Sequence, residues 1–407
     1  MNGKSIVELE ALRGLAAIVV LLHHFMLGFT PRLHGLLYPE QPMSLFGTPA
    51  FALVNGSAAV IVFFVLSGFV LTLGLFRSGS LAQAITGAAK RWPRLALTVM
   101  ITSGFAGLLM ALHSYANLEA AKSVPSMWLG WFYTWPSAGI AEVPKSVAQG
   151  ALTFFNRASS YNSNLWTMYY EFWGSMIAIA AAMLYMRFAR ERDARIFLGV
   201  AFVVSFVFSP FMSCFIVGVW LAKLYSQGWT WQWRGWQALV VAVLIVLLLG
   251  YHENLISGRA EGLYAILNPL TTFQPLRLRV LLHTIAAVLL INAFLSADSI
   301  RLLFGGRAGK TLGFLSFPLY LVQIPIICSV SALVFLEMDG SPQALKLIVT
   351  FAVTVTATVL LAFPIAYFDR WWVKMLNRRV AGPAGWLQAT IADSASLRLL
   401  ERSRQTP

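Results

Sequence analysis

The sequence predicts an all-α integral membrane protein, a bundle of about ten transmembrane helices with both termini in the cytoplasm. Hydrophobic residues make up 58% of the chain and charged residues 11%, whereas about a quarter of a soluble domain is charged. Apolar runs of spanning length number about ten. Most of the 30 Lys and Arg residues fall on alternate connecting segments, which places those segments in the cytoplasm.

The expected helices follow the apolar runs in order. They cover residues 11–30, 58–76, 94–113, 165–186, 196–209, 211–226, 237–251, 280–296, 313–336 and 345–368. The fifth and sixth are short and separated by Ser209-Pro210, which suggests a tight hairpin or a re-entrant pair. We expect a transmembrane domain over residues 1–376 and a cytoplasmic tail over 377–407.

The net charge of +14 predicts topology and not nucleic-acid binding, because Lys and Arg gather on the cytoplasmic loops of membrane proteins. The expected partner is the lipid bilayer, and the expected location is the inner membrane of a bacterium. The first apolar run has no small-residue cleavage site, so we expect it to be retained as a helix. Cys214 and Cys328 lie in apolar stretches without metal-type spacing, which favours free buried thiols.

Two expected outer segments are long. Residues 114–164 contain the aromatics Trp128, Trp131, Phe132, Tyr133 and Trp135, and residues 252–279 are rich in Gly, Asn and Pro. The aromatics fit an interfacial belt or a platform on which sugar rings stack. No inverted pair of Gly- or Pro-broken helices marks a transporter repeat.

The first helix carries on one face two ionisable side chains that are energetically costly to place in a membrane. Arg13 and His24 are eleven residues apart, which is about three turns plus 20°, with a rise of about 16 Å. Ionisable groups in a spanning helix suggest function, and imidazole suits general-base work. The alternative for His24 is a hydrogen bond to a neighbouring helix. His23 points about 100° away, and Glu10 is placed to pair with Arg13.

The next two helices carry a small-residue pair and a basic cluster. Ser67-Gly68 would let helices approach closely, and Ser67 has no adjacent base that would make it a nucleophile. Arg91 and Arg94 open the third helix. Guanidinium groups at a helix start favour phosphate, although positive-inside anchoring explains them equally well.

The fourth helix opens with the string NLWTMYYE, residues 164–171. Glu171 would lie within about two turns of the outer surface, where a carboxylate must be paired, protonated or facing water. It could face an acceptor or form a structural ion pair. Asn164, Trp166 and Tyr170 are the expected substrate contacts beside it. We treat His113 and His283 as interfacial or packed.

Four segments together resemble the membrane acyltransferase-3 family: Arg13 with ten residues before His24, FFVLSGF in helix two, KRWPRL before helix three, and NLWTMYYE. The resemblance covers nearly the whole chain. It implies a ten-helix bundle that takes an acyl group, usually acetyl, from cytoplasmic acyl-coenzyme A. Arg13 and His24 match the essential pair of the family. Arg91 and Arg94 match its coenzyme A-binding arginines, and we expect Ser67 to contact coenzyme A together with them.

One segment departs from the family pattern. The string LGxxSYxxYLxH ends here as SFPLYLVQ, so Gln323 stands where histidine is common. Members of the family acylate glycans, peptidoglycan and some small molecules. The chain shows no hydrolase-like domain after the last helix, so we expect the stand-alone type. The resemblance implies acyl-coenzyme A as a donor substrate, with no tightly bound cofactor and no metal.

The expected reaction is acyl transfer to a hydroxyl that approaches from outside, near Glu171 and Trp166, with His24 as general base. An acyl-histidine intermediate is a variant. The expected acceptor is a sugar of an exported polysaccharide or lipopolysaccharide, and the alternative is a small metabolite. A proton-coupled transporter or flippase, and a non-enzymatic partner in glycan assembly, remain as other classes. The acyl chain could be acetyl or succinyl, and the oligomeric state is open.

Overall fold

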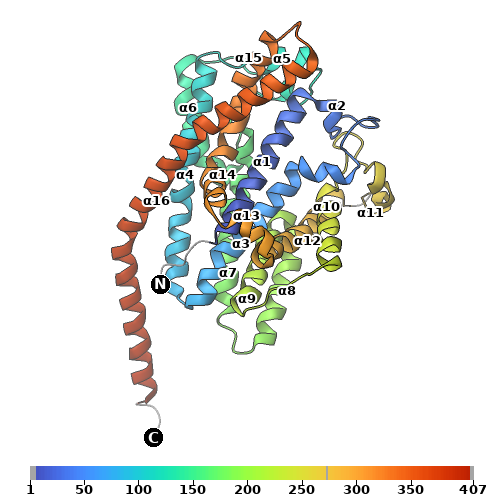
Figure 1. Cartoon of the computed structure of the whole chain (residues 1–407). Coiled ribbons are helices and arrows are strands. Elements are labelled where there is room, and N and C mark those ends of the chain that lie inside the picture. Colours follow the sequence, from blue (N-terminus) through green and yellow to red (C-terminus); the bar gives the residue numbers. More distant parts are fainter. Residues whose placement is uncertain (1–5, 272–273, 404–407) are drawn as a thin grey trace.

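The computed structural model describes residues 6–271 and 274–403, with side chains for residues 6–270 and 274–379. In this part of the chain every regular element is helical (Figure 1). Among the described residues, six segments are long and apolar enough to cross a membrane. They are α1 (Val7–Phe29), α3 (Gly56–Ser78), α4 (Leu81–Ala111), α12 (Pro275–Ser296), Arg307–Glu337 and the first part of α16, Gln343–Arg379.

Each of the ten predicted ranges coincides with a helical segment, and six of these are the apolar segments of spanning length. The helices outside the six are α7 (Trp166–Tyr185), α8 (Glu191–Phe208), α9 (Pro210–Ser226) and α10 (Trp236–Gly250). α9 and α10 are apolar but short. α8 begins with four charged residues among its first five, and α7 begins with Trp, Tyr and Glu side chains.

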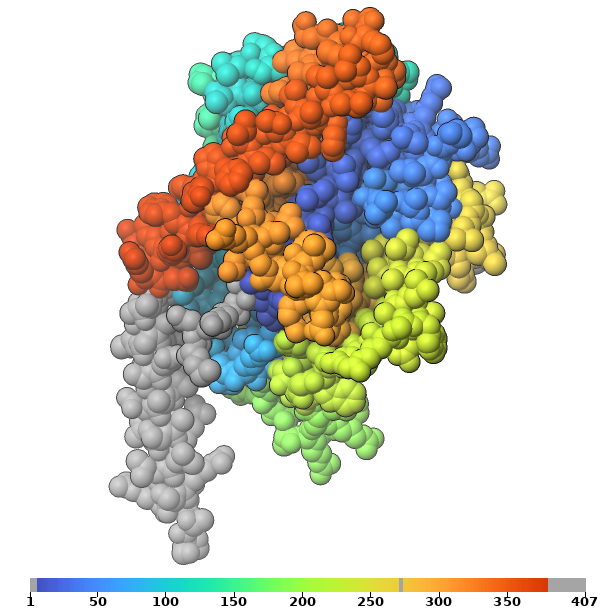
Figure 2. Space-filling view, viewed as in Figure 1, coloured from blue at the N-terminus to red at the C-terminus, as the bar shows by residue number. Residues whose placement is uncertain are grey.

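The longest apolar segments are not uniform. Arg307–Glu337 comprises α14 (Arg307–Ile326), the π-helical η6 (Ile327–Ser331) and α15 (Ala332–Glu337). α16 (Gln343–Ser403) continues past residue 376, where we expected the transmembrane domain to end. In Figure 2 the described side chains of α16 form a band over the upper left of the surface.

The connections contain several short helices. They are α2 (Pro31–His34), η1 (Pro49–Leu53), α5 (Asn117–Ser123), η2 (Leu129–Trp131), η3 (Gly139–Ala141), α6 (Glu142–Asn156), η4 (Ser163–Leu165), η5 (Gly262–Leu267), α11 (Asn268–Thr271) and α13 (Asp298–Phe304). The long segment 114–164 is therefore a folded unit. Its aromatics have different environments, since Trp128 and Tyr133 are buried while Trp131 is 54% exposed.

The start of α3 is held by a side chain that also reaches another helix. Asn55 accepts a hydrogen bond from the N–H of Ala58 at 3.2 Å, the usual role of Asn at this position. Its amide donates to the carbonyls of Leu249 and Tyr251 at 2.7 and 3.1 Å. The N-terminus of α3 is thereby tied to the C-terminal end of α10, which positions residue 57 and the segment after Tyr251.

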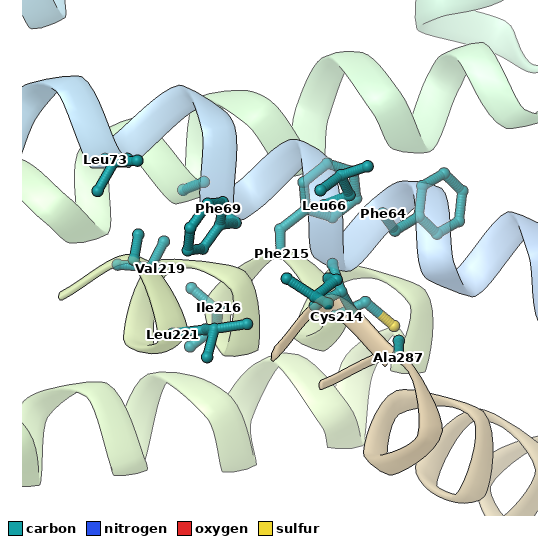
Figure 3. Packing of buried hydrophobic residues seen from close by; sticks show 14 of the residues in the cluster. Phe64, Leu66, Phe69, Leu73, Cys214, Phe215, Ile216, Val219, Leu221 and Ala287 are labelled. Atoms are coloured by element: carbon teal, nitrogen blue, oxygen red, sulfur yellow. The ribbon is translucent and has the colours of Figure 1, made fainter. Parts of the chain in front are cut away.

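The core forms where α3 crosses α9. A Cβ on Gly68 would collide with the backbone of Phe215, and one on Gly218 would collide with the carbonyl of Val65. Small residues at both positions let the helices touch, as expected for Gly68. Figure 3 shows Phe64, Phe69 and Phe215 filling the space beside this crossing.

Three further expectations about buried residues are confirmed. Cys214 and Cys328 are free and buried. His283 is fully buried and its Nε2 lies 2.9 Å from the carbonyl of Tyr251. The ring is therefore packed, and its polar contact is with the backbone.

Candidate functional site

Two cavities lie one beyond the other along α1 and α3. The first has a volume of about 350 Å³ and includes Arg13 of α1 and Ser67 of α3 among its lining residues. The second has a volume of about 230 Å³ and includes His23 of α1 and Ser57 of α3. Because α1 and α3 run in opposite directions, the later part of α1 meets the earlier part of α3. Val60 lines both cavities.

The first cavity carries most of the ionisable side chains that the sequence singled out. Five cationic residues line it together with three carboxylates: Arg13, Arg91, Arg94, Arg370 and Lys374, with Glu10, Glu171 and Asp369. α1, α4, α7 and α16 all contribute to this set. The fold thus brings Arg13, Ser67, Arg91, Arg94 and Glu171 to one place.

A polar network occupies one wall of this cavity. Arg91 and Glu171 form a buried ion pair between α4 and α7. Ser67 donates to Glu171 Oε1 at 2.8 Å, and Arg91 Nε donates to Ser175 Oγ at 2.9 Å. Glu171 therefore faces the arginines. Of the two alternatives for this carboxylate, the structure shows an ion pair.

Two other guanidinium groups at the cavity are not engaged in this way. Within the described part of the chain, neither Arg13 nor Arg94 forms an ion pair or a side-chain hydrogen bond. The structure shows no Glu10–Arg13 ion pair among the described residues, although Glu10 also lines the cavity. Asp369 accepts from Thr98 Oγ1 at 2.7 Å. The guanidinium donors of Arg13 and Arg94 are thus without an acceptor among the described side chains.

His24 lies deeper in the bundle and does not line the first cavity. Its ring stacks on Trp128 with centroids 5.2 Å apart and an interplanar angle of 18°. Gln323 lies beside the ring, and Gln323 Nε2 donates to the carbonyl of Tyr320 at 3.2 Å. No described residue hydrogen-bonds to His24 Nδ1. One ring nitrogen of His24 is therefore left for another partner.

His23 is part of a different cluster. It lines the second cavity, and its Nδ1 lies 2.9 Å from the carbonyl of Val54 and 3.0 Å from His34 Nε2. Gly56 passes so close that a Cβ there would lie 2.7 Å from the His23 ring. His23 is thus a packed and hydrogen-bonded residue at the wall of a cavity.

The second cavity contains a network that the sequence analysis did not find. His252 Nε2 lies 3.1 Å from Ser57 Oγ and 2.6 Å from Arg279 Nη1. His252 Nδ1 donates to the carbonyl of Glu253 at 2.5 Å, and Arg279 forms an ion pair with Glu253 at 2.9 Å. These residues come from α3, α12 and the segment after α10. The sequence indicates this network only through the charged residues in the Gly- and Asn-rich segment 252–279.

Burial and charge set the protonation of this network. Burial and the neighbouring Arg279 hold the pKa of His252 well below its ordinary value. Burial raises the pKa of Glu253, and Arg279 opposes that change. His34, buried beside His23, also has its pKa well below the ordinary value, mainly because of burial. His34 and His252 are therefore neutral near pH 7.

The expected substrate contacts are divided between different environments. Trp166 lines the second cavity. The Asn164 side chain is buried and donates to the carbonyl of Tyr320 at 2.7 Å. Tyr170 packs against Phe64, Trp166 and Phe211. Glu171 and Trp166, expected side by side at the acceptor, line different cavities.

Comparisons with known proteins identify the family of the chain. The family model for an acyltransferase domain matches residues 6–367. The O-acetyltransferase PaAT-1 of Phomopsis amygdali is 28% identical over 244 residues, which is 54% of this chain and 47% of that protein. The chain thus matches about half the length of this curated relative. No solved structure matches. Since the matching family model covers nearly the whole chain, the protein belongs to the acyltransferase-3 family.

Proposed function

We propose that this protein transfers an acyl group, most simply acetyl, from cytoplasmic acyl-coenzyme A to a hydroxyl of a glycan. Membership of an acyltransferase family and the similarity to an O-acetyltransferase support O-acyl transfer. The donor, the acceptor and the catalytic residues are the further content of the proposal. In the predicted orientation, the first cavity belongs to the cytoplasmic half of a bacterial inner-membrane protein and the second to the outer half.

The observation that carries the donor assignment is the first cavity. Arg13 and Arg94 bring guanidinium donors that no described side chain accepts from to a space of about 350 Å³, and Arg370 and Lys374 add positive charge. Guanidinium groups bind phosphate through paired N–H donors. We assign this end of the cavity to the phosphates of coenzyme A, with Arg91 held by Glu171 as part of the wall.

The position of His24 supports its assignment as the base. Arg13 and His24 are about 16 Å apart along α1, and a pantetheine arm is long enough to span that distance. The acceptor hydroxyl would lose its proton to His24 while its oxygen forms a bond to the thioester carbonyl. The carbon–sulfur bond then breaks, and the proton on His24 passes to the leaving thiolate. In the acyl-histidine variant, the imidazole first takes the acyl group itself.

Ligand stabilisation separates an enzyme of this kind from other membrane proteins. Acetyl-coenzyme A should raise the melting temperature of the purified protein in nanodiscs, because a ligand that binds only the folded state stabilises it. Acetyl-pantetheine, which lacks the nucleotide phosphates, should stabilise it much less. Equal effects of the two compounds would contradict the phosphate assignment. Absence of any effect, with glycan or lipid transport in the absence of acyl-coenzyme A, would favour a transporter.

The acceptor can be found by comparing cells. Mass spectrometry of cell-envelope and secreted glycans from a deletion strain should show the loss of one acetyl group from one sugar. Loss of acetyl from a small secreted metabolite, with unchanged glycans, would instead establish a small-molecule acceptor. Loss of one acetyl group lowers the mass of the glycan by about 42 Da, and loss of one succinyl group lowers it by about 100 Da. The same measurement therefore identifies the acyl chain.

A further inference from the structure

We propose that the second cavity binds one uncharged sugar ring of the acceptor, with Trp131 against its face and Ser57, His252 and Arg279 around its hydroxyl groups. The inference rests on the proposed function and adds the place, the residues and the charge class of the acceptor. The two long segments expected on the outer side, 114–164 and 252–279, both contribute residues to this cavity.

The charge of the cavity favours an uncharged ligand. Arg279 and Glu253 neutralise each other in an ion pair at 2.9 Å, with side chains 13% and 8% exposed. His252 is neutral because burial and Arg279 lower its pKa. The first cavity, in contrast, has more cationic than acidic residues. A carboxylate or phosphate in the second cavity would lose hydration and meet a guanidinium that Glu253 already neutralises.

The polar groups are suited to binding hydroxyls. Ser57 is half-buried at the cavity, so its oxygen can accept a hydrogen bond from a ligand and its hydroxyl hydrogen can be donated to a ligand oxygen. Arg279 retains further N–H donors besides those used on Glu253 and His252. A few fixed polar groups among apolar walls are typical of a small-molecule site.

The geometry argues that His252 is a positioning residue. A serine beside a histidine could indicate a nucleophile and its base. However, the guanidinium of Arg279 lies 2.6 Å from Nε2, closer than Ser57 at 3.1 Å. The lone pair of Nε2 is therefore directed at a cation, which makes it a poor proton acceptor for Ser57. Holding Ser57 and Arg279 in place is the role that these distances support.

The aromatic walls suit the apolar face of a ring. Trp131 is 54% exposed and Trp166 is 36% exposed, although both line the cavity. An indole left open to solvent at a cavity has its face available for stacking. The volume of about 230 Å³ lies below the roughly 300–1,000 Å³ of pockets for drug-sized ligands. One ring fits this size, with the rest of a glycan outside.

Trp128 connects this cavity to the proposed base. It lines the second cavity and stacks on His24 at 5.2 Å. A sugar ring in the cavity would therefore be one aromatic ring away from His24.

The test measures binding and transfer separately with the whole protein in nanodiscs. Methyl β-glucopyranoside and methyl β-glucopyranosiduronate serve as the uncharged and charged probes. Isothermal titration should show saturable binding of the uncharged probe and at least tenfold weaker binding of the charged one. Trp131→Ala and Ser57→Ala should each weaken the binding of the uncharged probe about tenfold, which corresponds to about 1.4 kcal/mol of binding free energy. Both variants should retain wild-type stabilisation by acetyl-coenzyme A.

Trp229→Ala and Ser226→Ala are the matched controls, because Trp229 is exposed outside both cavities and Ser226 hydrogen-bonds only a backbone carbonyl. Both should bind like wild type. No binding of the uncharged probe, equal binding of the charged one, or unchanged affinity in Trp131→Ala and Ser57→Ala would overturn the inference. Failure of acetyl-coenzyme A to stabilise the wild type would instead overturn the proposed function, and the glycoside titration would still report on the cavity.

Discussion

Arg91 and Glu171 join α4 to α7 through a buried ion pair, and Glu171 also accepts from Ser67 at 2.8 Å. Removal of one charge would leave the other buried without its counter-ion. We expect Arg91→Ala to destabilise the protein by about 3–5 kcal/mol, the range for broken buried pairs. Thermal unfolding in nanodiscs measures this effect.

The control is a pair of the same type at the surface. Arg195 and Glu191 are 3.5 Å apart, with side chains 56% and 42% exposed. Arg195→Ala should change stability by less than about 1 kcal/mol. Equal small effects of the two substitutions would show that the Arg91–Glu171 pair contributes little to the fold.

Arg94 should contribute more to the binding of the acyl donor than to the stability of the fold. It is exposed to the first cavity and has no ion pair among the described residues. We expect Arg94→Ala to weaken the binding of acetyl-coenzyme A about tenfold, which is the effect of losing one charge-assisted contact. The binding of acetyl-pantetheine should stay unchanged. Arg187→Ala removes an exposed arginine outside both cavities and should bind both compounds normally. A loss of affinity for both compounds in Arg94→Ala would contradict a phosphate contact.

His24→Ala should abolish acyl transfer and leave the bundle folded. The ring contacts Trp128 and Gln323, so its removal takes away the proposed base and little packing. Transfer of radiolabelled acetyl to glycan measures activity, and the elution profile in detergent reports folding. His113→Asn is the control, because His113 is exposed at the end of α4 with φ of 53°, where Asn is tolerated. Near-normal turnover in His24→Ala would exclude the base assignment.

The neutral histidines predict how stability changes with pH. His252 has a folded pKa well below its ordinary value of 6.5. Below pH 6.5 the unfolded chain therefore takes up a proton that the folded chain does not. The stabilisation is complete above pH 6.5 and declines as the pH falls, by up to about 1.4 kcal/mol per pH unit.

We expect the melting temperature to fall between pH 7.5 and 5.5, and His252→Asn to reduce that fall. His34→Asn should do the same, because burial also lowers the pKa of His34. His113→Asn, at an exposed position, should leave the pH dependence of the wild type unchanged. If all three variants kept the wild-type slope, protonation of His34 and His252 could not be the source of the acid sensitivity.

The crossing of α3 and α9 depends on Gly68. A methyl group at this position would strike the backbone of Phe215, whereas a Cβ at Gly74 of the same helix meets nothing within 4 Å. Gly68→Ala should therefore lower the melting temperature sharply or prevent folding, since a backbone neighbour cannot rotate away. Gly74→Ala should be neutral or stabilising by up to about 1 kcal/mol. Equal tolerance of the two substitutions would show that the helices can separate at little cost.

The sequence alone predicted the positions of the helices and that Arg13 and His24 share one face of α1. Apolar length and period depend on local composition, so each expected range coincides with a helical segment. The register of Arg13 and His24 depends only on helix geometry. Four motif segments were enough to indicate the family that the whole-chain comparison shows.

The tertiary structure decided which groups meet. From the sequence, Glu171 could face an acceptor or form an ion pair, and only the packing of α4 against α7 places Arg91 beside it. Trp128 could be assigned to a membrane belt from sequence, yet the folded segment after α4 stacks it on His24. Ser57, His252 and Arg279 carry no joint signal, because they are distant in the chain and meet only through long-range contacts such as those of Asn55. Helical periodicity is a local property, whereas the partners of a buried polar side chain depend on how distant segments pack.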